Sequence, residues 1–244
     1  MNLAQSPAAM PEGKVGILIP AYRARSTVAD LVARLRSLHP DIPVMVVDDG
    51  SADGTDQVAR EAGAEVLVLP VNGGKGTALA KGFAWASLQG WEWVLALDAD
   101  GQHPPEEVGR FLSYSPTALC GVVVGARDLH PRSMPLPRVC SNRLTTLLLE
   151  LQAGCRLWDS QCGFRMYRLE AVRAANLPDT GRFEWESGAL VRMARAGWKV
   201  EQVGISTIYA DAGSHIRPWR DTARFVRLWF GLWKWVVTGR RMSR

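Results

Sequence analysis

Trp93-Val-Leu-Ala-Leu-Asp-Ala-Asp-Gly-Gln-His-Pro-Pro-Glu106 joins an apolar run to two carboxylates, a glycine and a pair of prolines. Its first five residues are continuously apolar and turn formers follow them, which is typical of a strand buried on both faces of a parallel sheet. Asp98 and Asp100 come directly after this apolar run. Two carboxylates so close repel each other strongly in a low dielectric, so both stay ionised only beside a positive charge.

A divalent cation is the simplest source of that charge. Oxygen ligands suit Mg²⁺ or Mn²⁺, and an ion held by one or two carboxylates keeps other positions for water and substrate phosphates. A purely structural alternative exists, in which Asp98 caps the turn and Asp100 starts a helix at residues 104–107. The Asp-x-Asp spacing alone does not decide between the two.

Three further apolar segments precede this stretch, and each is followed by a polar loop and a helical pattern. In the first unit, Leu31, Leu35 and Leu38 recur at helical spacing after Ser26, the predicted N-cap. Repeated strand, loop and helix predict βαβ units, and therefore an α/β fold with a mainly parallel central sheet and helices on both faces. Ligands of such sheets gather beyond the C-terminal strand ends. The predicted strands cover residues 14–20, 43–48, 65–70 and 93–97.

The strand-end loops exclude several common sites. Residues 49–54 begin like a calcium loop, but Arg60 stands where the bidentate glutamate is required. Gly76 follows Lys75 where a phosphate loop needs Ser or Thr. Residues 20–25 contain no glycine, so the dinucleotide fingerprint is absent and hydride-transfer enzymes are disfavoured.

Asp48 and Asp49 end the second predicted strand and allow two interpretations. Asp readily accepts hydrogen bonds from neighbouring backbone amides, so both residues can cap the turn. Alternatively, one carboxylate accepts a hydrogen bond from a nucleobase N–H or a ribose hydroxyl.

Taken together, the four loops resemble those of the nucleotide-diphospho-sugar glycosyltransferases of family 2, which have the GT-A fold. The likeness is closest to the polyprenyl- and dolichyl-phosphate sugar transferase branch, and it covers roughly residues 14–216. The matching segments are residues 20–22, 47–55, 72–76, 97–105, 123–127, 141–142 and 159–165.

This resemblance implies a metal-dependent, inverting transfer of a sugar from a nucleoside diphosphate sugar to a lipid-linked or polyprenyl-phosphate acceptor. It implies Asp98 and Asp100 as ligands of Mg²⁺ or Mn²⁺, with His215 as a further candidate that is otherwise an ordinary loop residue. The residues implied to bind the nucleotide sugar are Pro20, Tyr22, Asp48, Asp49, Lys75, Asp98, Ala99, Gln102 and Arg127. Those implied on the acceptor side are Gly163, Phe164, Arg165 and Glu186.

Asp100 and Asp159 are the catalytic candidates. Asp159 is expected to act as a base or to position the acceptor, and its alternative is a loop-stabilising carboxylate. The chain departs from the family at residues 23–25, where Arg-Ala-Arg replaces the usual Asn-Glu and leaves the nucleobase open. A nucleotidyltransferase and a catalytically inactive membrane adaptor stay as alternative functions, although residues 21–25 lack the glycine-rich basic loop of the former.

Length and composition indicate one main domain. The chain has 244 residues and is 47% hydrophobic, which suffices for one large core. We expect a disordered leader at 1–13, a catalytic domain at 14–216 and a C-terminal appendage at 217–244. The leader lacks a basic start and an apolar core, so we expect a cytoplasmic protein. The four cysteines show no metal or disulfide spacing and are predicted to be reduced core thiols: Cys120, Cys140, Cys155 and Cys162.

The charge is concentrated at the C-terminus. The whole chain carries +5, and residues 217–244 hold eight Lys/Arg against the single Asp221. No other basic face is evident, which argues against nucleic-acid binding. Residues 221–237 are predicted to form an amphipathic, tryptophan-rich helix on the anionic inner membrane surface, which makes the protein peripheral. The alternative is that this helix packs on the domain or across a homodimer.

Two more segments have informative patterns. Residues 138–151 are predicted to form a core helix, with leucines at helical spacing: Leu144, Leu147, Leu148 and Leu151. The alternative comes from the resemblance, because the equivalent helix of that family faces the acceptor. Residues 198–209 are predicted to form a late strand that returns the chain to the site.

Overall fold

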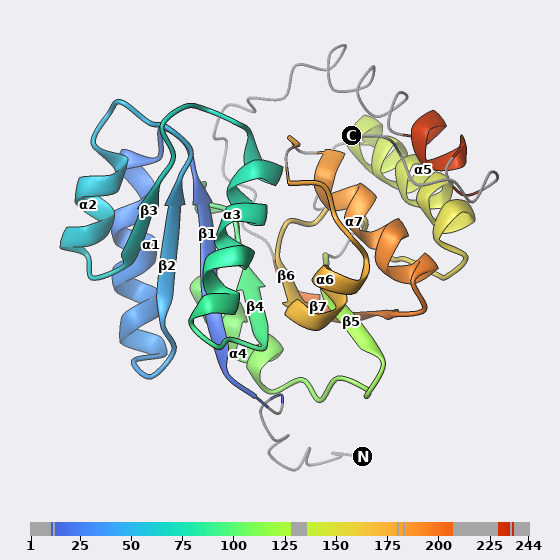
Figure 1. Cartoon of the computed structure of the whole chain (residues 1–244), viewed down its shortest axis with the longest axis horizontal. Helices are drawn as coiled ribbons and strands as arrows, with labels where there is room; N and C mark the ends of the chain where they lie inside the picture. The colour runs from blue at the N-terminus through green and yellow to red at the C-terminus, as the bar shows by residue number, and fades with distance from the viewer. Residues whose placement is uncertain are drawn as a thin grey trace.

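A computed structural model describes residues 11, 13–127, 136–179, 181–182, 184–206, 229–234 and 236, with backbone alone for 136–141. Figure 1 shows these residues as one α/β body. Nearly all of the predicted leader, His215 and most of the predicted tail helix lie outside the described residues.

The described part of the chain contains a seven-stranded sheet in the order β3-β2-β1-β4-β6-β5-β7. Strand β6 runs antiparallel to both neighbours, and the other pairs are parallel. The sheet is thus mixed but mainly parallel, which confirms the predicted fold class. The strands are β1 (Val15–Ala21), β2 (Val44–Asp48), β3 (Glu65–Val68), β4 (Trp93–Ala96), β5 (Cys120–Arg127), β6 (Arg165–Arg168) and β7 (Lys199–Ile205).

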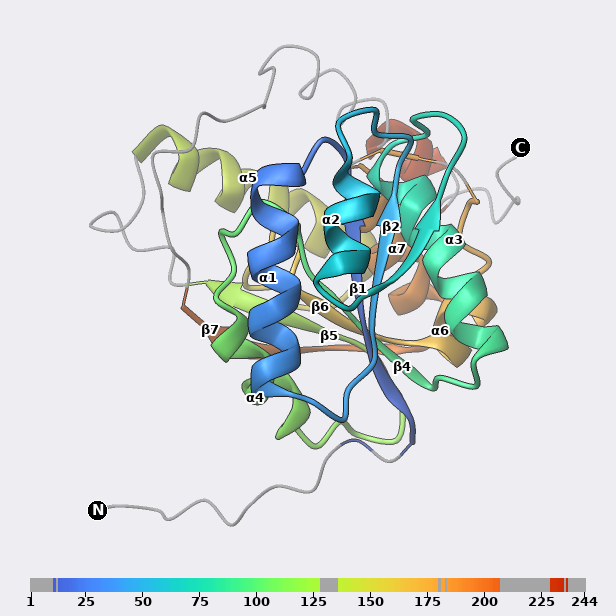
Figure 2. The ribbon, with the colours of Figure 1, turned by 90° about the vertical axis from the view of Figure 1, so that its left-hand side faces the viewer.

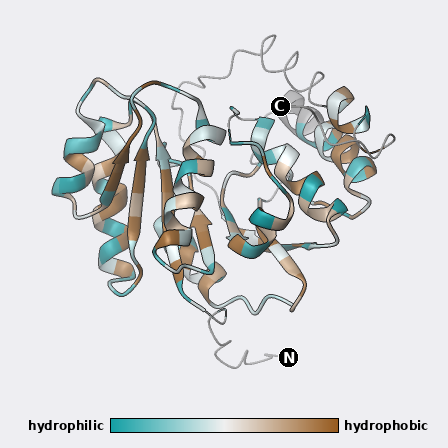
Figure 3. Cartoon of the chain, viewed as in Figure 1, coloured by the Kyte–Doolittle hydropathy of each residue, from teal (hydrophilic) through white to brown (hydrophobic). Residues whose placement is uncertain are grey.

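The continuous apolar runs of β1, β2 and β4 are buried along their whole length, as expected for central strands covered on both faces. Their registers place Ala21 beside Asp48 and Leu18 beside Ala96. The loops that follow these three parallel strands therefore meet at one edge of the sheet. Figure 3 shows the apolar strands lying between helices whose outer faces are polar.

Helices cover both faces of the sheet (Figure 2). Helix α1 packs on α2, while α3 packs on α7, and α7 in turn carries α5 at the far end of the molecule. The helices are α1 (Arg25–Leu38), α2 (Thr55–Glu61), α3 (Lys75–Leu88), the 3₁₀ turn η1 (Pro105–Glu107), α4 (Val108–Leu112), α5 (Leu136–Ala153), α6 (Leu169–Ala174) and α7 (Glu184–Arg195).

The predicted N-cap of α1, Ser26, was wrong by two residues. The helix begins at Arg25, Ala24 is its N-cap, and no side chain caps it. The N–H of Ala24 donates to Thr55 Oγ1 at 2.9 Å, which fixes the entry of the chain into the helix two residues before Ser26. Leu38, at the other end of α1, is 45% exposed and lies outside the core.

Helix α5 exists as predicted, but the predicted buried face was wrong. Leu144, Leu147 and Leu151 are each more than half exposed, whereas Leu149 is fully buried. The helix docks on α7 through its other side, where Arg195 Nε donates to the carbonyl of Gln152 at 2.6 Å. A stripe of leucines is therefore left on the surface.

The described residues of the tail, 229–234 and 236, pack on α5 (Figure 1). Gln152 Nε2 donates to the carbonyl of Trp229 at 2.8 Å, and Leu232 is buried. Phe230 and Trp233 are 58% and 51% exposed. Among the described residues, no helix is long and apolar enough to span a bilayer.

Three of the four cysteines confirm the prediction of free thiols. Cys120 and Cys162 are buried, and Cys155 is half-buried; none of the three forms a disulfide. Burial raises the pKa of the Cys162 thiol to about 12, so it stays protonated and unreactive at neutral pH. The side chain of Cys140 lies outside the described residues.

Candidate active site

The two aspartates after β2 have different partners. Both oxygens of Asp49 are engaged, Oδ1 by the N–H of Gly73 at 2.8 Å and Oδ2 by the N–H of Gly74 at 2.7 Å. Asp49 therefore fixes the loop that leads into α3. Asp48 accepts the N–H of Ser51 at 3.1 Å through Oδ1, while its buried Oδ2 has no partner in the described part of the chain. Burial raises the pKa of Asp48.

An open aromatic ring borders the same strand end. Tyr22 is 45% exposed and follows Pro20, which is buried in β1. The guanidinium of Arg23 lies 5.3 Å from the centre of the Tyr22 ring. Arg23 has a φ of 52°, in the left-handed region that non-glycine residues seldom adopt, and its N–H donates to Ser51 Oγ at 2.8 Å. This strained residue joins the loops after β1 and β2.

An ammonium group lies between two carboxylates at the centre of the site. Lys75 Nζ is 2.5 Å from Asp98 Oδ1 and 2.7 Å from Glu186 Oε2. Burial by itself lowers the pKa of Lys75, but the two carboxylates outweigh it and the pKa is raised. Burial favours a raised pKa for Asp98 as well, yet contact with Lys75 lowers it. Lys75 and Asp98 are therefore both ionised near neutral pH.

Asp100 has a more open setting than Asp98. Asp100 is exposed to solvent, and its Oδ1 accepts a hydrogen bond of 2.9 Å from the N–H of Gln102 in the same loop. Loss of hydration around the carboxyl raises the pKa of Asp100, and the charge of Asp98 adds to the shift. Between the two aspartates, the carbonyl of Ala99 accepts a hydrogen bond of 2.6 Å from Thr27 Oγ1. Sequence patterns gave no indication that Thr27 supports this loop.

Gly163 packs closely against Asp98 and Lys75. A Cβ at Gly163 would lie 2.5 Å from Asp98 Oδ2 and 2.7 Å from Lys75 Nζ, so only glycine leaves room there. Within the described ranges, no group of three or more His, Cys, Asp or Glu side chains forms a metal site. Asp98 and Asp100 offer carboxylate oxygens, which are the ligands that Mg²⁺ and Mn²⁺ prefer. His215 lies outside the described residues.

Asp159 is held tightly by Arg127, at the end of β5. Arg127 Nε lies 2.5 Å from Asp159 Oδ2, and Nη2 lies 3.0 Å from Oδ1. Oδ1 also accepts the N–H of Gln161 at 3.0 Å, and Asp159 is 1% exposed. Such a bidentate pair fixes the orientation of the guanidinium.

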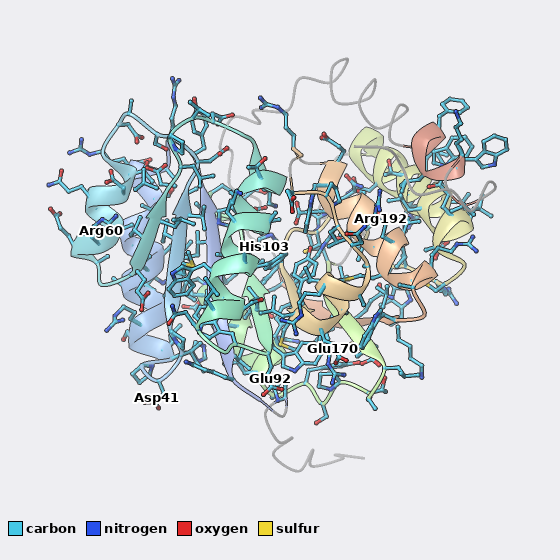
Figure 4. The ribbon with its side chains drawn as sticks, in the orientation of Figure 1. Asp41, Arg60, Glu92, His103, Glu170 and Arg192 are labelled. Carbon is cyan, nitrogen blue, oxygen red and sulfur yellow. The ribbon has the colours of Figure 1, made fainter. Side chains whose placement is uncertain are left out.

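Arg165 and Phe164, two of the residues predicted on the acceptor side, lie inside the protein. Arg165 is buried and donates to the carbonyls of Cys162, Glu186 and Ser160 at 2.7, 2.7 and 2.9 Å. Phe164 is fully buried, and its ring lies 5.3 Å from that of His103. Figure 4 labels His103. These two residues connect the loop before β6 to α7 and to the Asp98–Asp100 loop.

A cavity of about 360 Å³ opens next to the Arg127–Asp159 pair. It combines three arginines with apolar side chains, a combination that the sequence did not suggest because the residues lie on separate segments. The lining residues are Arg127, Arg143, Thr146, Leu147, Glu150, Arg156, Leu157 and Trp158.

Known proteins share both sequence and architecture with this chain. The family described as glycosyl transferase family 2 matches residues 16–175. An undecaprenyl-phosphate mannosyltransferase of Micrococcus luteus is 30% identical over 210 residues, which cover 82% of this chain and 86% of that protein. A polyprenol monophosphomannose synthase of Mycolicibacterium smegmatis is 27% identical over 214 residues, covering 83% of this chain and 80% of that protein.

Solved structures agree on the fold. Glucosyl-3-phosphoglycerate synthase of Mycobacterium tuberculosis, crystallised with Mn²⁺, UDP and glucosyl-3-phosphoglycerate, aligns with a TM-score of 0.65 at 22% identity, covering 95% of this chain and 82% of that chain. Mannosyl-3-phosphoglycerate synthase of Rubrobacter xylanophilus aligns with a TM-score of 0.68 at 21% identity. The alignment covers 95% of this chain and 77% of that chain. With the match to residues 16–175, these likenesses show that the chain belongs to glycosyltransferase family 2 and is a glycosyltransferase with the GT-A fold.

Proposed function

We propose that this protein transfers a sugar from a nucleoside diphosphate sugar to a polyprenyl phosphate at a membrane surface. The observation that carries the proposal is the cluster at the ends of β1, β2 and β4. There, Oδ2 of Asp48 has no hydrogen-bond partner among the described residues, and it lies on the same edge of the sheet as Asp98 and Asp100. One part of the cluster suits a nucleoside and the other suits a metal-bound diphosphate.

At the nucleoside end, the buried Oδ2 of Asp48 needs a hydrogen-bond donor, because an unpaired buried carboxylate oxygen is costly. A nucleobase N–H or a ribose hydroxyl supplies one, and the exposed ring of Tyr22 gives a surface for stacking. Asp49 contributes indirectly, by fixing the loop that carries Lys75.

At the diphosphate end, Asp98 and Asp100 would hold Mg²⁺ or Mn²⁺. The ion supplies electrostatic stabilisation of the departing diphosphate. The structures with Mn²⁺ and UDP among the relatives support a divalent ion in this family. Gln102, next to Asp100 in the loop, borders the same position.

For the acceptor, we propose that the cavity beside Arg127 binds the phosphate of a lipid. Arg143 and Arg156 add positive charge, while Leu147, Leu157 and Trp158 offer apolar contact to the first part of the hydrocarbon chain. Both named relatives act on polyprenyl or undecaprenyl phosphate by their names, which supports this class of acceptor.

In the proposed reaction, an oxygen of the acceptor phosphate attacks the anomeric carbon with inversion. The bond from that carbon to the diphosphate breaks, and the nucleoside diphosphate leaves with the bonding electrons. A phosphate oxygen is already anionic, so no base has to remove a proton. Asp159 then acts by positioning Arg127, because both of its oxygens are engaged by that guanidinium.

Membrane contact is proposed for the surface of α5 and the tail. Leu144, Leu147 and Leu151 form an exposed apolar stripe, and Phe230 and Trp233 are exposed on the packed tail segment. Such a surface suits a lipid interface, where aromatic and basic side chains are favoured.

Calorimetry with a panel of nucleoside diphosphate sugars, with and without Mn²⁺, tests the donor part. We expect one base to bind in a metal-dependent way and Asp48→Asn to weaken that binding. An inactive adaptor would bind no member of the panel, and a nucleotidyltransferase would bind nucleoside triphosphates in preference.

A further inference from the structure

We infer that Lys75 is the counter-ion of Asp98 before a divalent ion binds, and that it makes the ion and the nucleoside diphosphate bind cooperatively. The inference rests on the proposed metal site. Its starting point is geometric: Lys75 Nζ lies 2.5 Å from Asp98 Oδ1. The ammonium thus occupies one oxygen of the carboxylate that the divalent ion needs.

The ammonium cannot move away into water. Its side chain is only 10% exposed, and it begins α3, whose position is fixed. A Cβ at Gly76 would lie 2.5 Å from Cβ of Trp185, and the N–H of Thr77 donates to the carbonyl of Gly181 at 3.1 Å. These contacts anchor the start of α3 against the segment that begins α7.

Glu186 gives the ammonium a second partner. It lies 2.7 Å from Lys75 Nζ, and its side chain is only 8% exposed. Lys75 can therefore release Asp98 without losing every anionic neighbour. Glu186 Oε1 has no hydrogen-bond partner among the described residues, so the carboxylate has unused acceptor capacity.

A divalent ion that arrives alone meets this ammonium at short range. Two cations on one carboxylate repel each other, so ion binding alone is weakened. A nucleoside diphosphate brings negative charge that both cations share, which removes the penalty. Ion and nucleotide then bind cooperatively, and the coupling is reciprocal. Lys75 acts here as a positioning residue.

The test compares the Kd for Mn²⁺ alone with the Kd for Mn²⁺ in saturating UDP or GDP, whichever binds. In Lys75→Met, the ion meets Asp98 without a competing ammonium on Oδ1, so the Kd for Mn²⁺ alone should fall roughly tenfold. The gain in Mn²⁺ affinity on adding the nucleotide should shrink. Glu186→Gln leaves the ammonium on Asp98 alone and should raise the Kd for Mn²⁺ alone.

Lys81→Met is the matched control, because it removes the same charge from an exposed position of the same helix. It should change neither constant. A purely structural role of Lys75 would weaken Mn²⁺ binding with and without nucleotide. Because Lys75→Met leaves buried carboxylates unpaired, its melting temperature is measured with and without Mn²⁺, and the ion should raise it more than in the wild type.

An unchanged or higher Kd for Mn²⁺ alone in folded Lys75→Met would overturn the inference. If that variant does not fold, Glu186→Gln is the deciding variant. An unchanged or lower Kd of Glu186→Gln for Mn²⁺ alone would overturn the inference. If the wild type binds nucleotide with Mn²⁺ and the variants have the same Kd values as the wild type, only the role of Lys75 is refuted. If the wild type shows no Mn²⁺-dependent nucleotide binding, both the proposed donor site and this inference are refuted.

Discussion

Asp48 and Asp49 are neighbours in the chain, yet the fold gives their carboxylates different partners. Asp49 accepts two backbone N–H groups of the loop before α3, whereas Asp48 keeps Oδ2 without a partner in the described residues. The sequence placed both at a strand end but could not separate them, because the partners of Asp49 are 24 and 25 residues away.

This contrast predicts opposite effects of two matched substitutions. Asp49→Asn places an amide N–H against a backbone N–H, and we expect the free energy of unfolding to fall by about 1–3 kcal/mol. Asp48→Asn keeps the bond to Ser51 and removes a buried charge, so stability should hold while nucleotide affinity falls about tenfold or more. Urea unfolding and calorimetry measure the two quantities. If Asp49→Asn were stable but had lost nucleotide binding, Asp49 and not Asp48 would be the nucleotide-binding residue.

His103 predicts a pH dependence of stability. It is 5% exposed, and burial lowers its pKa to about 4, while an unfolded histidine titrates near 6.5. Between these values the unfolded chain binds more protons than the folded chain. The free energy of unfolding therefore rises with pH across this window, by roughly 2–4 kcal/mol from this group.

Urea unfolding at a series of pH values checks this expectation. Below pH 4 the contribution of His103 is lost, and above about 6.5 it is constant. His103→Gln should flatten the slope between pH 4 and 6.5 relative to the wild type. Parallel slopes for the two proteins would show that His103 does not titrate in this way.

Helix α5 was predicted from its leucine pattern, but that pattern does not predict which face of the helix is buried. Leucine periodicity predicted the helix, but the same period fits a face turned to the core, to a membrane or to another protein. The packing of α5 buries Leu149 and leaves Leu144, Leu147 and Leu151 exposed. Only the packing of distant segments decides which face is buried.

This arrangement predicts that α5 binds membranes through its leucine stripe. Changing Leu144, Leu147 and Leu151 together to Gln should leave the melting temperature nearly unchanged, because exposed substitutions seldom matter by more than about 0.5 kcal/mol each. Binding to anionic vesicles in co-sedimentation should fall. Wild-type binding should also weaken at high salt, since each basic residue near the leaflet contributes about 1 kcal/mol.

Leu149→Ala is the matched control on the same helix. Because Leu149 is fully buried, this change should cost about 2–5 kcal/mol of stability and leave vesicle binding of the folded protein intact. Equal vesicle binding by the triple variant and the wild type would exclude the stripe as a membrane surface. A change from dimer to monomer in light scattering would instead assign the stripe to a homodimer.

At the scale of the whole molecule, the sequence predicted the parallel part of the sheet because β1, β2 and β4 are continuously apolar. It did not predict that β6 runs antiparallel between β4 and β5, since Arg-Met-Tyr-Arg has no such pattern. Local patterns also could not show that Lys75 lies between Asp98 and Glu186, because Glu186 follows it by more than a hundred residues.

The most direct test of the account is the release of nucleoside diphosphate from a panel of donor sugars, measured with and without polyprenyl phosphate and Mg²⁺ or Mn²⁺. We predict release that needs both the acceptor and the ion, and a loss of about 10²-fold or more in Asp100→Ala. Asp41→Asn, at the opposite edge of the sheet (Figure 4), should be as active as the wild type. No acceptor-dependent release with any donor, or wild-type turnover in Asp100→Ala, would contradict the account.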